Sequence, residues 1–145
     1  MGAGVTSMAG RGLAFPKTLI EEMVAHCRSR YPKEACGLLA ADASGALVQA
    51  YPMTNTEDSP VGYAMDPREQ LQAEKQMRQR GQRAAGIYHS HTASAAYPSS
   101  VDVRLAISTD ISYVLVSLQD RARPDVKSYR IDGTTVTPEE VRVVS

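Results

Sequence analysis

The sequence has little of several residue types, and each shortage narrows the class of protein. Of its 145 residues, none is tryptophan, one is phenylalanine and two are cysteine. Cys27 and Cys36 do not have the spacing of a zinc knuckle, and no charged segment followed by an apolar segment precedes them, as it would in a secretory signal. We therefore expect a reduced, cytoplasmic protein with two buried free thiols, and a disulfide between them is the alternative.

The sequence also lacks an excess of charge of one sign and a long apolar run. Its 16 Lys and Arg residues balance its 16 Asp and Glu residues, so no overall field favours nucleic acid or an anionic membrane. No apolar run approaches the length of a membrane span. We expect neither nucleic acid nor a membrane as a partner, while 145 residues with 43% hydrophobic side chains fit one domain with a substantial core.

Local patterns predict a mixture of helices and strands. Helices are expected over residues 16–30, over residues 67–80 after an N-cap at Asp66, and from Ser99 onwards. Strands are expected over residues 34–41, 47–53, 84–91, 111–118, 126–131 and 136–144, with a possible short strand at 62–65. Residues 1–12 lack periodicity and are expected to be a flexible tail, which leaves residues 13–145 as the domain. These elements indicate an α/β protein with a sandwich or a curled mixed sheet.

The strongest chemical signal lies at the end of the strand expected over residues 84–91. His89 and His91 are two residues apart, and alternate residues of a strand point to the same face, so both imidazoles face one point. Asp102 falls in the first turn of the helix that begins at Ser99, from where its carboxylate can reach back toward the histidines. Two His and one Asp leave a fourth coordination position open, which is the composition of a catalytic zinc site.

Each of these residues also has a purely structural interpretation. An isolated His-x-His pair is about as often just two polar residues at the end of a strand. Ser99 and Asp102 equally fit an N-cap and a third-position acid, which would stabilise the start of the helix. Glu34 at the start of a strand is ordinarily solvated. His26, alone on the first helix, is expected to be solvated or hydrogen-bonded rather than a ligand. Arg104 lies two residues past Asp102, on nearly the opposite face of the helix, and is expected to be exposed rather than catalytic.

The spacing of the polar residues carries a family resemblance. The pattern is His-x-His, seven residues, Ser, two residues and Asp, with a glutamate upstream in the sequence Glu34-Ala35-Cys36-Gly37-Leu38-Leu39. This pattern resembles the JAMM (MPN+) metallopeptidases, and the run from His89 to Val103 is similar to their compact bacterial branch, which cleaves cysteine from the C-terminus of a sulfur carrier protein. The resemblance implies a single-domain MPN fold, which is related to that of the cytidine deaminases.

The resemblance also implies a chemistry and a partner. His89, His91 and Asp102 would bind Zn²⁺. Glu34 would act as general base and then general acid, and Ser99 would donate a hydrogen bond to the tetrahedral oxyanion. The implied partner is a ubiquitin-like sulfur carrier protein with a Gly-Gly-type C-terminal tail, and the small residues at 92–96 leave space for such a tail. The oligomeric state stays open.

Three alternative functions compete with this interpretation. A zinc deaminase would need His-x-Glu and Pro-Cys-x-x-Cys, and the sequence has neither motif. An isopeptidase or carrier-maturation protease of another pathway would share the chemistry, but ubiquitin isopeptidases of the family carry insertions for which the short connections here leave little room. A non-catalytic MPN interaction domain would be expected to have lost ligands that this sequence retains.

Overall fold

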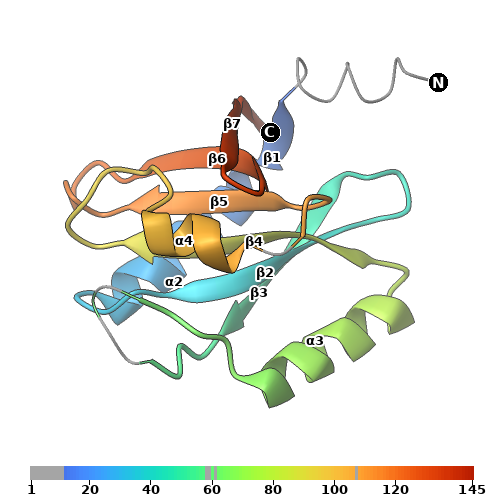
Figure 1. The fold of residues 1–145 in the computed structure, drawn as a ribbon. Helices are drawn as coiled ribbons and strands as arrows, with labels where there is room; N and C mark the ends of the chain where they lie inside the picture. Colours follow the sequence, from blue (N-terminus) through green and yellow to red (C-terminus); the bar gives the residue numbers. More distant parts are fainter. Residues whose placement is uncertain (1–11, 58–59, 61, 107) are drawn as a thin grey trace.

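The computed structural model describes residues 12–57, 60, 62–106 and 108–145, and its centre is a six-stranded sheet in the order β3-β2-β4-β5-β6-β7 (Figure 1). The strands of this sheet are Cys36–Ala41 (β2), Leu47–Met53 (β3), Arg83–His91 (β4), Ser112–Ser117 (β5), Asp125–Asp132 (β6) and Thr135–Glu139 (β7). Neighbouring strands are antiparallel except β4 and β5, which run parallel. The sheet is therefore mixed, as the sequence predicts.

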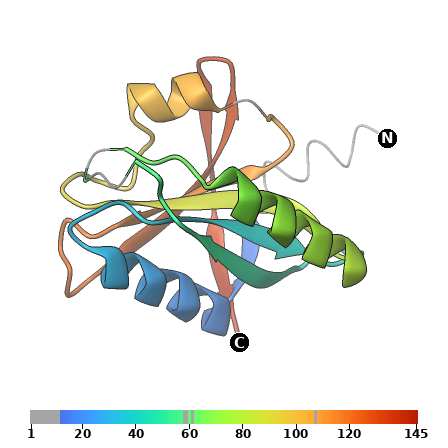
Figure 2. The same cartoon turned by 90° about the horizontal axis from the view of Figure 1, so that it is seen from below.

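Three helices of the described residues cover the two faces of the sheet. They are Lys17–Arg30 (α2), Pro67–Gln79 (α3) and Ser100–Leu105 (α4). Figure 2 shows α2 on one face, with α3 and α4 on the opposite face. The side chains of α2 pack against Leu39 and Tyr88 from β2 and β4, whereas the side chains of α3 pack against Leu38 and Ala40 from β2. Because neighbouring residues of β2 serve opposite faces, the whole strand is buried.

The alternation along β4 decides which residues reach the face with α3 and α4. Tyr88 packs in the cluster with α2, so Ile87, His89 and His91 point to the other face. The Tyr88 ring occupies the space above Gly37, where any Cβ atom would collide with it. The glycine in β2 thus lets a large side chain fill the α2 face while both histidines emerge on the opposite face.

The two ends of the domain meet in a small second sheet that the sequence analysis did not predict. Leu13–Pro16 (β1) pairs in parallel with Val141–Val144 (β8). Pro16 therefore ends a strand, and the prediction that it begins the first helix is wrong by one residue. The strand expected over 136–144 is interrupted at Glu140, so β7 stays on the edge of the main sheet while β8 leaves it. The expected strand covers β8, but β1 has only four residues and both strands have a distant partner, so no local pattern predicts their pairing.

Two expectations concern the rest of the chain. The flexible tail expected at residues 1–12 lies outside the described residues except for Gly12. None of the described helices is long and apolar enough to cross a bilayer.

Candidate active site

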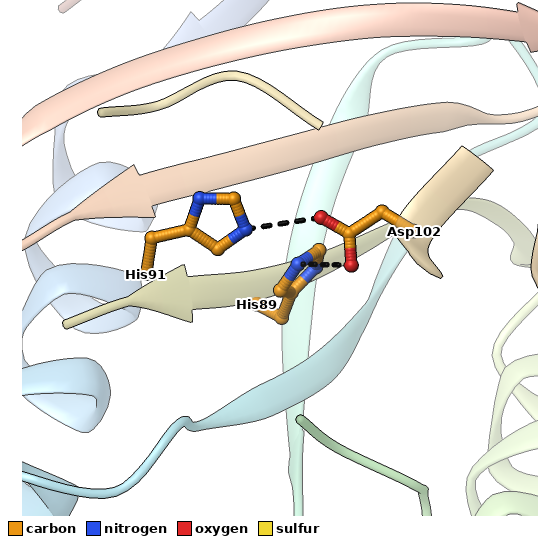
Figure 3. A group of neighbouring side chains, drawn as sticks. All are labelled: His89, His91 and Asp102. Carbon is orange, nitrogen blue, oxygen red and sulfur yellow. Dashed lines mark hydrogen bonds and ion pairs between the residues drawn. The ribbon is translucent and has the colours of Figure 1, made fainter. Parts of the chain in front are cut away.

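Strand β4 and helix α4 bring three candidate ligands together (Figure 3). Nε2 of His89 lies 3.2 Å from Oδ1 of Asp102, and Nε2 of His91 lies 3.0 Å from Oδ2. Each of the three residues offers one ligand atom, and these atoms lie within 4.8 Å of one another. Both histidines are buried, whereas Asp102 is partly exposed. The structure therefore gathers the three residues that the spacing singles out.

The carboxylate of Asp102 is aimed by the start of its own helix. Ser99 is the N-cap of α4, and its Oγ accepts a hydrogen bond of 3.1 Å from the backbone N–H of Asp102. In return, Oδ2 of Asp102 accepts a bond of 2.9 Å from the backbone N–H of Ser99. This is a capping box, so the structural interpretation of both residues is confirmed. The same bonds turn the carboxylate toward the histidines, and the two interpretations hold together.

The tautomer of His91 follows from one hydrogen bond. Its Nδ1 lies 2.9 Å from the carbonyl oxygen of Ala95. Because a carbonyl oxygen only accepts, Nδ1 must carry a proton. In the neutral imidazole this leaves the lone pair on Nε2, which faces Asp102. The loop after β4 thus presents His91 in the form that binds metals.

The loop that fixes His91 is itself held by two hydroxyl groups. Oγ of Ser117 donates to the carbonyl of Ser94 over 2.6 Å. The hydroxyl of Tyr129 donates to the carbonyl of Ala96 over 2.6 Å. Together with the bond at Ala95, three consecutive carbonyl groups are each bound by a side chain from β4, β5 or β6. The sheet therefore sets the position of the histidine's hydrogen-bond partner.

The three candidate ligands have the chemistry of a cation site. With Nε2 of His91 as a lone pair, two acceptor atoms face each other across 3.0 Å. Nε2 of His89 is buried, lies 3.2 Å from Oδ1 of Asp102 and has no hydrogen-bond partner within the described residues. A cation among these atoms would satisfy all of them, and two imidazoles with one carboxylate are donors that zinc accepts. The residues present therefore fit a bound zinc ion.

The pKa values of the three residues show which of them are charged. Burial lowers the pKa of His89, and the nearby Asp102 only partly opposes this effect. Burial also lowers the pKa of His91, but the bonds that the protonated ring makes to Asp102 and Ala95 raise it more, so the pKa lies above its ordinary value. In the protonated form Nε2 donates to Asp102, and a bound metal would replace that proton. Burial raises the pKa of Asp102, yet the two histidines lower it more, and the pKa falls well below its usual range. The carboxylate therefore stays ionised and can bind a metal without first losing a proton.

Glu34 lies beside this cluster and just before β2, not within the strand. The residue is 6% exposed, so the alternative interpretation of a solvated glutamate is wrong. The next residue is held by β4, because Ala35 donates to Oγ of Ser90 over 2.8 Å and accepts from the Ser90 N–H over 3.0 Å. Burial raises the pKa of Glu34 to about 7, while His91 lowers it and Asp102 raises it. A carboxyl group with that pKa can both take and give a proton near neutrality.

A tyrosine that the sequence analysis did not single out completes the surroundings. The ring of Tyr63 stacks on that of His89, with centroids 4.4 Å apart and planes inclined by 27°. The short strand expected at 62–65 is reduced to a single bridge between Asn55 and Met65. Tyr63 also lines a pocket of about 280 Å³ that opens beside Asp102. No periodicity or motif marks this residue, because only the fold brings it to the histidine.

The residues interpreted as structural are placed as expected. Nδ1 of His26 shares a hydrogen bond of 2.6 Å with the hydroxyl of Tyr88, and Arg104 is exposed. Cys27 and Cys36 are buried and free. Burial raises the pKa of each thiol to about 12, so both stay protonated and unreactive.

A central strand that ends in two histidines, a helix that returns an aspartate to them and a buried glutamate alongside define a peptidase of the JAMM type. The chain belongs to the family described as prokaryotic homologs of the JAB domain, which matches residues 16–132. It is 47% identical over 127 residues to the CysO-cysteine peptidase of Mycobacterium tuberculosis (strain ATCC 25618 / H37Rv), a match that covers 87% of each chain.

Solved structures share the fold. The solution structure of protein DSY2949 from Desulfitobacterium hafniense matches with a TM-score of 0.84 at 40% identity, over 92% of this chain and 93% of that chain. AF2198, a JAB1/MPN domain protein from Archaeoglobus fulgidus, matches with a TM-score of 0.60 at 18% identity, over 92% of this chain and 99% of that chain. The predicted family and the predicted MPN fold are therefore confirmed.

Proposed function

We propose that this chain is a zinc-dependent peptidase that hydrolyses an amide bond in the C-terminal tail of a ubiquitin-like sulfur carrier protein and releases cysteine. The observation that carries this proposal is the group of His89, His91 and Asp102, whose ligand atoms lie within 4.8 Å of one another beside the buried Glu34. The identity of 47% to a CysO-cysteine peptidase supports the carrier and the leaving group.

In the proposed site, His89, His91 and Asp102 hold the metal. When bound there, zinc supplies a Lewis acid that lowers the pKa of a water molecule and polarises the scissile carbonyl. His91 is oriented for this task by Ala95, and Asp102 is oriented by the cap of α4. Such outer contacts restrict the geometry of the ligands and so favour metal binding.

The proton is handled by Glu34 in this proposal. Its raised pKa of about 7 lets it accept a proton from the attacking water and pass that proton to the leaving amine. Ser99 would stabilise the oxyanion. Because Oγ of Ser99 accepts from the Asp102 N–H, its own O–H proton is free to be donated toward the substrate.

The substrate tail enters over small residues. The loop at 92–96 is Thr-Ala-Ser-Ala-Ala, and a glycine in the tail would let its carbonyl approach the metal without a Cβ clash. An extended tail can also pair with a strand through main-chain hydrogen bonds. We place the catalytic domain at residues 13–145, preceded by a tail without a chemical role. Two free buried thiols fit a reducing compartment, so we place the enzyme in the cytoplasm.

The test is incubation of the zinc-loaded chain with a recombinant sulfur carrier protein whose Gly-Gly terminus is extended by one cysteine. Intact-mass measurement should show the loss of one cysteine residue. The His89→Ala/His91→Ala double variant should show no loss, and Arg104→Gln, on the exposed side of α4, should behave as the parent. An uncleaved carrier beside an efficiently cleaved carrier–lysine isopeptide conjugate would favour an isopeptidase. No cleavage of either would favour an interaction domain.

A further inference from the structure

Asn55, in the segment between β3 and α3, has a buried side-chain amide. The side chain of Asn55 uses all of its hydrogen-bonding capacity although the residue is 3% exposed. Its Nδ2 donates to the carbonyl of Glu34 over 3.0 Å and to the carbonyl of Gly62 over 2.9 Å. Its Oδ1 accepts from the N–H of Glu57 over 3.0 Å and from the N–H of Ala64 over 2.9 Å.

These four bonds join two parts of the candidate site. Gly62 and Ala64 are the two neighbours of Tyr63, so the amide binds the backbone on both sides of that residue. The Tyr63 ring then lies on His89 with a centroid separation of 4.4 Å. The same amide holds the carbonyl of Glu34. One side chain therefore fixes both the ring against a candidate ligand and the backbone of the candidate base.

The backbone next to Glu34 is also held by hydrogen bonds to β4. Ser90 binds the peptide groups on both sides of Ala35, and Asn55 binds the preceding carbonyl. A buried carbonyl that loses its donor costs free energy, and the backbone relaxes to reach another partner. Loss of the Asn55 donors would therefore move Glu34 before it moved β4.

We propose that Asn55 is a positioning residue for hydrolysis. Its carboxamide holds the backbone of Glu34 in position and keeps the Tyr63 ring stacked on His89. This inference rests on the proposed function, which gives Glu34 the role of base. It needs no contact between Asn55 and the substrate. A displacement of the base by about 1 Å is expected to lower kcat by about 10²-fold, with little change in KM, because substrate binding does not use this group.

Two variants separate the halves of the amide. Asn55→Asp keeps the acceptors for Glu57 and Ala64 and, at a pH where its carboxyl group is ionised, has no donor for Glu34 or Gly62, whereas Asn55→Ala removes all four bonds. Thr54→Val is the control, because its hydroxyl bond of 2.7 Å goes to Glu69 at the start of α3 instead. The substrate is the carrier protein extended by Gly-Gly-Cys. The value of kcat is divided by the fraction of folded protein, which is measured from the dispersion of the amide signals in the NMR spectrum of each variant.

A second readout is independent of turnover. Amide hydrogen exchange of the metal-free protein should show protection of the Ala64 N–H in the parent and in Asn55→Asp, and loss of protection in Asn55→Ala. In both Asn55 variants kcat should fall by about 10²-fold, while Thr54→Val keeps the parental value. A fall of kcat in Asn55→Asp with Ala64 still protected assigns the effect to the lost donors.

The outcomes distinguish this inference from the proposed function. Parental kcat in Asn55→Asp, together with an inactive Glu34→Gln, overturns the role of Asn55 and leaves the proposed function intact. Parental kcat in Glu34→Gln overturns the assignment of the base itself. An equal loss in Thr54→Val overturns the inference as well, because it would show that any weakening of this segment has the same effect.

Discussion

Replacing Ser99 separates the structural role of its hydroxyl group from its proposed catalytic role. The hydroxyl accepts a bond from the Asp102 N–H and so caps α4, while its proton is proposed to stabilise the oxyanion. Ser99→Thr keeps both functions. Ser99→Gly and Ser99→Ala remove the donor, but glycine is tolerated at an N-cap much better than alanine. The three variants therefore change stability and catalysis in different proportions.

The structure gives the expected magnitudes. Helix α4 has six residues, none of them buried, so its cap supplies a large part of its local stability. Ser99→Ala should lower the free energy of unfolding by about 1 kcal/mol, and Ser99→Gly by only about a few tenths of 1 kcal/mol. For a domain of this size about 1 kcal/mol corresponds to about 2–4 °C in Tm. Loss of one oxyanion donor should lower kcat by about 10²–10³-fold, or about 2.7–4 kcal/mol in activation free energy.

The assay compares Tm from calorimetry with kcat for release of cysteine from the carrier protein. We expect Ser99→Gly to melt close to the parent and to lose about as much kcat as Ser99→Ala. A kcat loss that follows Tm across the series would refute the reasoning, because it would assign the whole effect to the cap. Parental kcat in Ser99→Gly would remove Ser99 from the chemistry.

Three further predictions test other parts of the site. Glu34→Gln should keep zinc and Tm but lose most turnover, because an amide cannot accept the proton; turnover at the parental rate would return Glu34 to a structural role. Tyr129→Phe removes the donor to the buried Ala96 carbonyl, so competition with a fluorescent chelator should show a zinc affinity lower by about 10-fold or more. Unchanged affinity would show that the position of this loop does not affect metal binding by His91. Replacing the terminal glycines of the carrier by valine should slow cleavage strongly in the mass assay, whereas equal rates would argue against recognition of a glycine tail.

The parts of the site that were predictable from the sequence are those set by short-range geometry. The two-residue period of a strand places His89 and His91 on one face, and a capping box spans only Ser99 to Asp102. The start of α3 was predictable for the same reason, since Asp66 accepts from the N–H two residues later. Each of these patterns is complete within one element, so no knowledge of the fold is needed.

The remaining parts depend on contacts between distant segments. Asn55 reaches back to Glu34, and Tyr129 reaches the Ala96 carbonyl from two strands away in the sheet. Neither residue type is unusual for its position, so a polar loop residue and a strand tyrosine gave no signal. Glu34 shows the same limit, because its burial at 6% exposure and the bond from Asn55 to its carbonyl depend on tertiary contacts. The family resemblance indicated that this glutamate is catalytic, whereas its local pattern indicated a solvent-exposed side chain.

The most direct test of a zinc site at His89, His91 and Asp102 is to titrate zinc into the metal-stripped protein while following release of cysteine from the carrier. The account predicts that the rate rises linearly up to about one zinc per chain and then stays constant, and that the His89→Ala/His91→Ala variant neither binds zinc nor gains activity. Full activity of the stripped parent, or a double variant that responds to zinc as the parent does, would contradict it.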